Sequence, residues 1–195
     1  TIHGSIMVFF VLTAGLSGSV SNLLIPLQIG ARDMASGFLN MLSYWFFAAS
    51  SVVMITSLFV ETGPASGGWT VYPPLSALPQ AMPGSGAGMT LWLVSMTLFI
   101  AGSLLGSLNY IVTIINLRTR GMSMVRLTLT IWAFFVTAIL GVISFPVLLS
   151  AALLLMFDRL CGICFYLYVI MVSVELLHTS GGMTCLLYNS YAADD

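Results

Sequence analysis

The chain has 195 residues, of which 59% are hydrophobic and only 6% are charged, and its mean hydropathy is +1.07. Because a soluble domain carries about 25% charged residues, this composition excludes an ordinary globular protein. The five basic residues, all arginine, and the six acidic residues form neither the basic footprint of a nucleic-acid-binding protein nor the polar excess of a disordered chain. The composition therefore predicts a membrane protein with no nucleic-acid partner.

Four apolar segments occupy residues 2–29, 38–60, 89–117 and 126–157, and a weaker fifth covers 164–177. Each of the four exceeds the roughly 20 residues that a transmembrane helix needs. We therefore predict an all-α fold, a polytopic bundle of transmembrane helices. The sequence begins without an initiator methionine and without the charged region that opens a signal peptide, and we expect it to be a fragment.

The arginines predict how the bundle is oriented. Four of the five lie in two short connections, at 30–37 and 118–126. The positive-inside rule places both connections in the cytoplasm, and the connection at 61–88, rich in proline and glycine, then faces outward. His3 is expected near the outer surface, and Asp33 on the inner side.

Small and polar residues recur within the spans. Thr13, Ser17 and Ser21 are spaced four residues apart, which predicts one shared helix face, and Gly102 and Gly106 form a small-residue contact motif. Such residues most often only let helices approach and share hydrogen bonds.

Asparagine is costlier to bury in a membrane, so Asn22, Asn40 and Asn109 are better candidates for a water-lined path. All three are predicted in the half of the membrane on the side of Asp33. This agreement indicates a polar path through that half of the bundle, although a small channel for another solute would show the same feature.

Among the ionisable residues, His3 is the strongest candidate for a chemical role. It begins an apolar span and is followed by Gly4, which leaves room for a flat group. Axial ligation of a haem would explain a histidine there, whereas a packed, hydrogen-bonded histidine is the more frequent case. Cys161 and Cys164 form a CxxC beside an apolar run without a second CxxC, which favours buried thiols over a metal or redox site.

Four longer motifs, in this order, resemble subunit I of the haem–copper oxidases. The motifs are Thr1–Phe10 (TIHGSIMVFF), Asn22–Ala35 (NLLIPLQIGARDMA), Gly68–Leu75 (GWTVYPPL) and Gly106–Arg118 (GSLNYIVTIINLR). They are similar, respectively, to the start and the inner end of the family's second helix, to its outer loop between helices three and four, and to the end of helix four. The resemblance implies part of a twelve-helix subunit.

This resemblance implies roles for particular residues. His3 is similar to an axial ligand of the low-spin haem, and Asp33 to the carboxylate at the mouth of the proton-uptake channel called the D-pathway. Along that channel the resemblance places Asn40, Asn22, Asn109 and Ser103, and beside the haem region it places the loop aromatics Trp69 and Tyr72.

The resemblance also implies what the whole subunit does. It would be the catalytic subunit of a terminal respiratory oxidase that reduces O2 to water with electrons from cytochrome c and pumps protons. Its cofactors would be the low-spin haem, an oxygen-binding haem and copper. Its partners would be oxidase subunits II and III, cytochrome c through subunit II, and the lipid bilayer. The copper ligands are absent from the motifs found, so the chain alone is not expected to be active.

The chain departs from the family at two places. Ser36 and Gly37 stand where the family usually has Phe-Pro, a variant more similar to bacterial oxidases, which favours a bacterial inner membrane. The close match covers residues 1–159, and from there it thins and ends after Thr184. We expect residues 160–195 to be a fifth span or an erroneous stretch of sequence.

Three alternatives stay open at this point. A quinol-oxidising relative would use the same helices, because the site that selects the electron donor lies elsewhere. A truncated, non-catalytic membrane fragment would share the family origin. An unrelated small transporter or channel would bind no haem.

Overall fold

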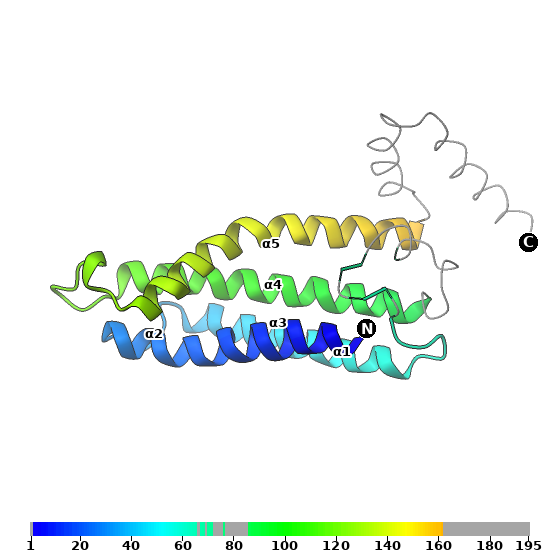
Figure 1. Cartoon of the computed structure of the whole chain (residues 1–195), viewed down its shortest axis with the longest axis horizontal. Coiled ribbons are helices and arrows are strands. Elements are labelled where there is room, and N and C mark those ends of the chain that lie inside the picture. Colours follow the sequence, from blue (N-terminus) through cyan, green and yellow to red (C-terminus); the bar gives the residue numbers. More distant parts are fainter. Residues whose placement is uncertain (1, 66, 69, 72–75, 77–85, 162–195) are drawn as a thin grey trace, which may run out of the picture.

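The computed structural model describes residues 2–65, 67–68, 70–71, 76 and 86–161 (Figure 1). Its helical elements, in chain order, are α1 (Ile2–Ser5), η1 (Ile6–Val20), α2 (Ser21–Ile29), α3 (Gly37–Thr56), η2 (Ser57–Phe59), α4 (Ala87–Asn116), η3 (Met124–Arg126) and α5 (Leu129–Cys161). No strand occurs among these residues. The predictions for Cys164, for the fifth segment at 164–177 and for the rest of the tail lie outside the described residues.

In the described part of the chain, four helices are long and apolar enough to cross a membrane. They are Ile2–Ile29, Gly37–Phe59, Ala87–Asn116 and Leu129–Leu160. Their limits differ from the predicted segments by only a few residues, because long apolar runs bounded by Gly, Pro and Arg are the clearest signal that a sequence gives. The predicted all-α, polytopic helix bundle is confirmed.

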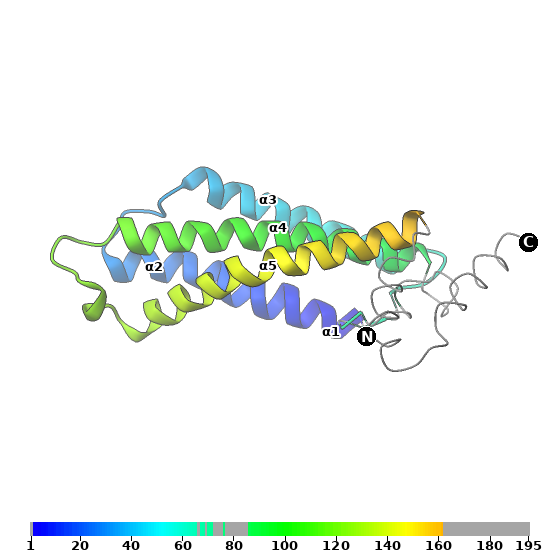
Figure 2. The ribbon, with the colours of Figure 1, turned by 90° about the horizontal axis from the view of Figure 1, so that it is seen from above.

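Helix α4 is the central helix of this bundle. It packs against α3 and α5, and the long helix made of α1, η1 and α2 runs beside them (Figures 1 and 2). Of the residues in its most apolar stretch 44% are buried, against 12 to 17% in the other three spans. Those three therefore turn most of their apolar surface outward, as helices surrounded by lipid or by further protein do.

The helices run between two ends of the bundle, here called the His3 end and the Asp33 end. At the His3 end, buried residues from α3, α4 and α5 form one apolar core, which includes Met54, Trp92, Phe99 and Leu155. At the Asp33 end, Ile25, Ile29, Met34, Ile114, Leu127 and Ile131 form another. The candidate site lies between these two cores.

The α2 helix ends at the Asp33 end in a left-handed turn. Gly30 has φ 73°, and its N–H donates to the Pro26 carbonyl, as a glycine that closes a helix commonly does. Thr119 donates to the Ile29 carbonyl from its N–H (3.1 Å) and its Oγ1 (2.6 Å). The α4–α5 connection is thereby tied to the end of α2, and an added Cβ at Gly30 would collide with Thr119 Oγ1.

The middle of the first span is wound differently from the prediction. Segment η1 is a π-helix, in which bonds join residues five apart. Thr13 and Gly18, and likewise Ala14 and Ser19, line the same cavity. Ser17 lies among residues whose side chains are outside the described set, so the expected polar face of Thr13, Ser17 and Ser21 stays a prediction.

Small residues bring α3 and α4 close together, which confirms the contact motif. An added Cβ at Gly102 would lie 3.1 Å from both the Phe46 Cβ and the Ser43 carbonyl oxygen. Nearer the His3 end, the Ser50 Oγ donates to the Ser95 carbonyl and the Ser95 Oγ donates to the Ser50 carbonyl, each at 2.8 Å. Here the hydroxyls of two fully buried serines join the helices directly.

Candidate functional site

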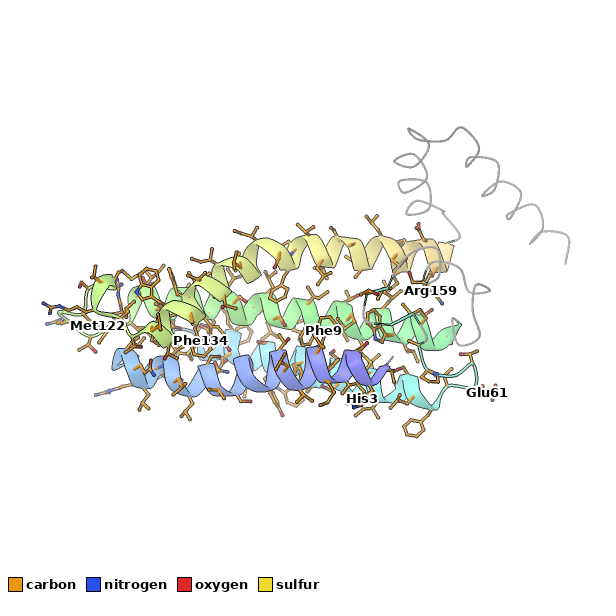
Figure 3. All side chains as sticks on the ribbon, viewed as in Figure 1. His3, Phe9, Glu61, Met122, Phe134 and Arg159 are labelled. Atoms are coloured by element: carbon orange, nitrogen blue, oxygen red, sulfur yellow. The ribbon has the colours of Figure 1, made fainter. Side chains whose placement is uncertain are left out.

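His3 lies on α1, at one end of the bundle, and its side chain is exposed (Figure 3). An added Cβ at the neighbouring Gly4 would meet no atom within 4 Å, so the space beside the histidine is open. An exposed imidazole with an open flank fits the axial ligand of a flat macrocycle, since only one ring nitrogen has to reach the iron. In the part of the chain that the structure describes, no group of three or more His, Cys, Asp or Glu side chains could hold a metal ion.

Asp33 lies in the turn between α2 and α3, and its side chain is exposed. Its Oδ1 accepts a hydrogen bond from the Met34 N–H at 2.7 Å. An exposed carboxylate at the end of a membrane helix can exchange protons with bulk water, because nothing isolates it from the aqueous phase.

A buried asparagine fixes the position of this turn. The side-chain amide of Asn109, which is 0% exposed, pairs with the backbone of Ser36: Oδ1 accepts from the Ser36 N–H (3.1 Å) and Nδ2 donates to the Ser36 carbonyl (3.2 Å). One turn further, Thr113 Oγ1 accepts from the Ala35 N–H at 3.0 Å. Ser36 in turn caps α3, its side chain accepting from the Leu39 N–H. The turn that carries Asp33 is thus held against α4 at the start of α3.

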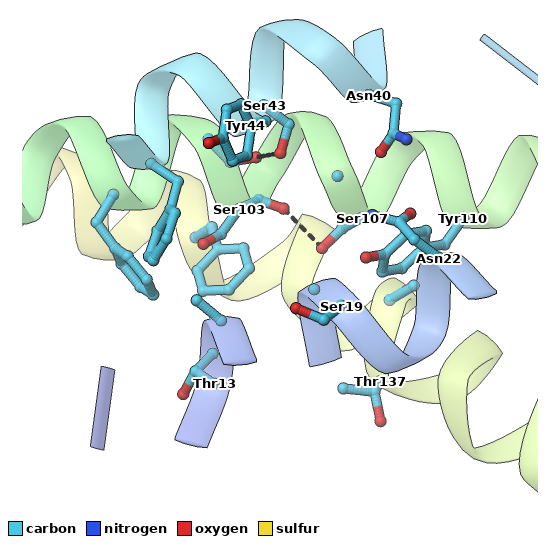
Figure 4. Close-up of a pocket in the computed structure, with 18 of the residues that line it drawn as sticks. Thr13, Ser19, Asn22, Asn40, Ser43, Tyr44, Ser103, Ser107, Tyr110 and Thr137 are labelled. Atoms are coloured by element: carbon cyan, nitrogen blue, oxygen red, sulfur yellow. Dashed lines mark hydrogen bonds between the residues drawn. The ribbon is translucent and has the colours of Figure 1, made fainter. Parts of the chain in front are cut away.

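A cavity of about 310 Å³ lies between the helices, in the middle of the bundle (Figure 4). The polar side chains that line it come from all four spans and are Thr13, Ser19, Asn22, Asn40, Ser43, Tyr44, Ser103, Ser107, Tyr110 and Thr137. Toward the His3 end it is bounded by aromatic rings, of which Phe47 and Phe99 line it and also pack in the core at that end. The cavity therefore has a mostly apolar wall, into which polar side chains from all four spans are set.

Some of the polar atoms around the cavity are already paired. Ser43 Oγ donates to the Gly102 carbonyl and Ser107 Oγ to the Ser103 carbonyl, both at 2.9 Å. In contrast, the Oδ1 atom of Asn22 is buried and has no hydrogen-bond partner within the described part of the chain. A buried polar atom left unpaired is costly, and a cavity of this size and polarity can hold the water that would pair with it.

The structure brings together only some of the residues singled out from the sequence. Asn22, Asn40 and Ser103 line one cavity. Asn109 lies beside it with its amide paired to Ser36, and Asp33 lies beyond it at the surface. Trp69 and Tyr72 lie outside the described residues.

Sequence reasoning missed other residues of the cavity wall. Ser107 and Tyr110 follow Ser103 by four and seven residues, a spacing that places all three on one helix face, so this signal was present in the sequence. Ser19 precedes Asn22 by three residues, so the same kind of spacing links these two residues of the cavity wall.

Comparisons with known proteins agree with this geometry. A family model described as cytochrome c and quinol oxidase polypeptide I matches residues 1–184. The alternative cytochrome c oxidase subunit 1 of Bradyrhizobium diazoefficiens is 41% identical over 191 residues, which is 98% of this chain and 32% of that protein.

Two further relatives are similar over a shorter stretch. The putative cytochrome c oxidase subunit 1-beta of Streptomyces avermitilis is 43% identical over 83% of this chain and 28% of its own length. The cytochrome c oxidase subunit 1 of Eremothecium gossypii is 40% identical over 82% of this chain and 29% of its own length. The chain thus spans about a third of the length of the curated relatives that it matches.

Proposed function

The chain belongs to the cytochrome c and quinol oxidase polypeptide I family, and we propose that it supplies one axial ligand of a low-spin haem and the entrance of a proton-conducting path. Family membership makes it an integral membrane protein and part of a haem–copper oxidase subunit I. The observation that carries the proposal is the cavity lined by polar side chains from all four spans, in a bundle that has the Asp33 turn at one end and His3 at the other.

His3 is the residue proposed to bind the haem. Its imidazole would present one ring nitrogen to the iron, and the open space beside Gly4 would leave room for the ring edge. The haem, when bound, supplies a one-electron carrier. Trp69 and Tyr72 are proposed, on the sequence resemblance alone, to lie near this haem.

Asp33 is proposed to collect protons at the opposite end of the bundle. From there, Asn40, Asn22 and Ser103 would order water in the cavity through amide and hydroxyl groups. Uncharged groups suit this task, because they orient water without trapping a charge inside the membrane. The unpaired Asn22 Oδ1 is the atom most in need of such water.

Asn109 is proposed to serve the same path as a positioning residue. Both polar atoms of its amide are bonded to the Ser36 backbone, three residues after Asp33, so it would act by fixing the Asp33 turn at the start of α3. Its own amide has little capacity left for water.

The wider setting of the proposal follows the family. The connections at 30–37 and 118–126 would face the cytoplasm of a bacterium, and the connection at 61–88 the outside. Subunits II and III would be the partners, and electrons would arrive from cytochrome c. The family's description also covers quinol oxidases, so oxygen uptake measured separately with reduced cytochrome c and with a quinol distinguishes the two donors.

The haem assignment is tested in an oxidase complex whose subunit I carries this sequence. His3→Ala is expected to abolish the absorbance of the low-spin haem, because no second side chain of α1 can ligate iron. An unchanged low-spin spectrum would overturn the assignment of His3 while leaving the proton path untouched.

The proton path is tested in the same complex by Asp33→Asn. We expect proton uptake and oxygen turnover to fall at least tenfold, while the haem spectra stay unchanged. Glu61→Gln is the matched control, since it removes an exposed carboxylate at the other end of the bundle (Figure 3). Equal proton uptake in the two variants would refute the role of Asp33.

A further inference from the structure

Four arginines gather at the Asp33 end of the bundle, and the proton path uses none of them. Arg32 lies in the α2–α3 turn, and Arg118, Arg120 and Arg126 lie in the α4–α5 connection. We call these four residues the arginine face. Figure 3 places Met122, which lies in the same connection, at the opposite end from His3, Glu61 and Arg159.

Hydrogen bonds between the two segments hold the arginine face together. Thr119, which stands between Arg118 and Arg120, donates twice to the Ile29 carbonyl, three residues before Arg32. Thr128 Oγ1 donates to Gln28 Oε1 at 2.6 Å, two residues after Arg126. The four positive charges therefore sit on segments that are fixed to one another rather than on separate loops.

The positive charge of this face is poorly balanced. Asp33 is the one acidic residue in the two segments, at 30–36 and 117–128, and its Oδ1 is engaged by the Met34 N–H. The Nη1 atom of Arg118 is buried without a hydrogen-bond partner among the described residues. A buried guanidinium nitrogen without an acceptor is costly, so this atom would gain from an acceptor that the described residues do not supply.

The surface beside the arginines is apolar. Val125 is 91% exposed and Leu129 is 87% exposed, on either side of Arg126. Since α4 ends at Asn116 and α5 begins at Leu129, the connection lies where a membrane helix meets the lipid headgroups. A ligand for this surface would carry a negative charge together with an acyl chain.

We propose that the arginine face binds the headgroup of an anionic phospholipid, with the phosphate near Arg118 and the acyl chains along Val125 and Leu129. Basic clusters directly at the end of a transmembrane helix attract such lipids by charge. The proposal rests on the helices crossing a membrane and does not depend on the proton path.

The test uses a purified oxidase complex whose subunit I carries this sequence. Native mass spectrometry counts the bound molecules during separate titrations with phosphatidylglycerol, with phosphatidylcholine and with inorganic phosphate. Phosphatidylglycerol is expected to bind at least tenfold more tightly than phosphatidylcholine. R118Q/R120Q is expected to weaken that binding about tenfold, whereas E61Q, at the other end, leaves it unchanged.

Three results would overturn the proposal. Equal affinity for the two lipids would remove the charge selectivity, and binding that neither R118Q/R120Q nor R32Q/R120Q weakens would place the lipid elsewhere. Displacement of the lipid by millimolar phosphate would identify the ligand as a free anion. The variant R32Q/R120Q changes only exposed side chains, so it stays informative if R118Q prevents assembly.

Discussion

Two stretches of the α3–α4 interface contain the same kinds of residue in opposite states. Near the His3 end, the hydroxyls of Ser50 and Ser95 each donate to the other residue's backbone carbonyl, and both side chains are fully buried. Nearer the Asp33 end, Asn40 and Ser103 line a cavity of about 310 Å³. The first stretch has used its polar groups to join two helices, and the second keeps them available to water.

What separates the two stretches is the presence of a third helix at the second one. Aromatic rings stand between them: the Phe99 ring packs against Phe10 and Phe47, with centroids 5.4 and 6.4 Å apart. On the side of these rings that faces the Asp33 end, the first span contributes Asn22 to the wall of the cavity. A serine in a membrane helix therefore cannot be assigned to a water path from its chemistry alone, because the nearest acceptor decides what it does.

The largest effect is expected from closing the gap that Gly102 allows. Gly102→Leu would place a side chain against the Phe46 Cβ and the Ser43 carbonyl, each 3.1 Å from the first added carbon. Overpacking of this kind costs about 3 kcal/mol, so we expect a lower thermal unfolding temperature and a poor yield of assembled oxidase.

Gly37→Ala is the matched control for that substitution, since an added Cβ there meets no atom within 4 Å. It is expected to leave both the unfolding temperature and the yield unchanged. If the two glycine variants behaved alike, the close approach of α3 and α4 at Gly102 would lose its significance.

A smaller effect is expected from removing the amide of Asn109. Asn109→Leu leaves the N–H and the carbonyl of Ser36 without their side-chain partner, a loss of about 2 kcal/mol. We also expect slower proton uptake, because the Asp33 turn is no longer fixed at the start of α3. Both quantities can be measured on the assembled oxidase, by thermal unfolding and by a pH indicator during turnover.

Asn116→Leu provides the comparison, because that amide is exposed at the end of α4. It should change neither quantity. Normal proton uptake in Asn109→Leu, despite the lower stability, would show that the turn does not need this anchor.

The fold could be predicted from the sequence to a large extent. Apolar runs bounded by Gly30 and Arg32, or by Arg118 and Arg126, marked the ends of helices to within a few residues. The close contact at Gly102 was predicted as well, since a small residue in a membrane helix has few other uses. These features are local, and the membrane makes them more decisive than they would be in water.

The candidate site could be predicted only in part. Asn22, Asn40 and Ser103 were expected along one path, and the structure places them around one cavity. The pairing of Asn109 with Ser36 could not be seen, because it joins residues 73 positions apart. The π-helical winding of η1 could not be seen either, because the sequence gives no signal for it.

The smallest effect on stability, and the sharpest test of the comparison, comes from the paired serines. The double variant Ser50→Ala, Ser95→Ala removes both hydroxyls, whereas the backbone carbonyls that accepted from them remain, which costs about 1 kcal/mol. Proton uptake should not change, because these two hydroxyls already form hydrogen bonds between α3 and α4. Ser103→Ala removes a hydroxyl of the same kind from the cavity wall, and there we expect slower proton uptake with a change in stability within about 0.5 kcal/mol.

The two variants should therefore have opposite effects on stability and on proton uptake. Stability should move in the double variant and proton uptake in Ser103→Ala, measured on the same assembled oxidase by thermal unfolding and by proton uptake. Slow proton uptake in the double variant would mean that the water path passes Phe99 and continues to the His3 end. In that case the aromatic rings would not close the cavity, and Ser50 and Ser95 would belong to the path that Asp33 begins.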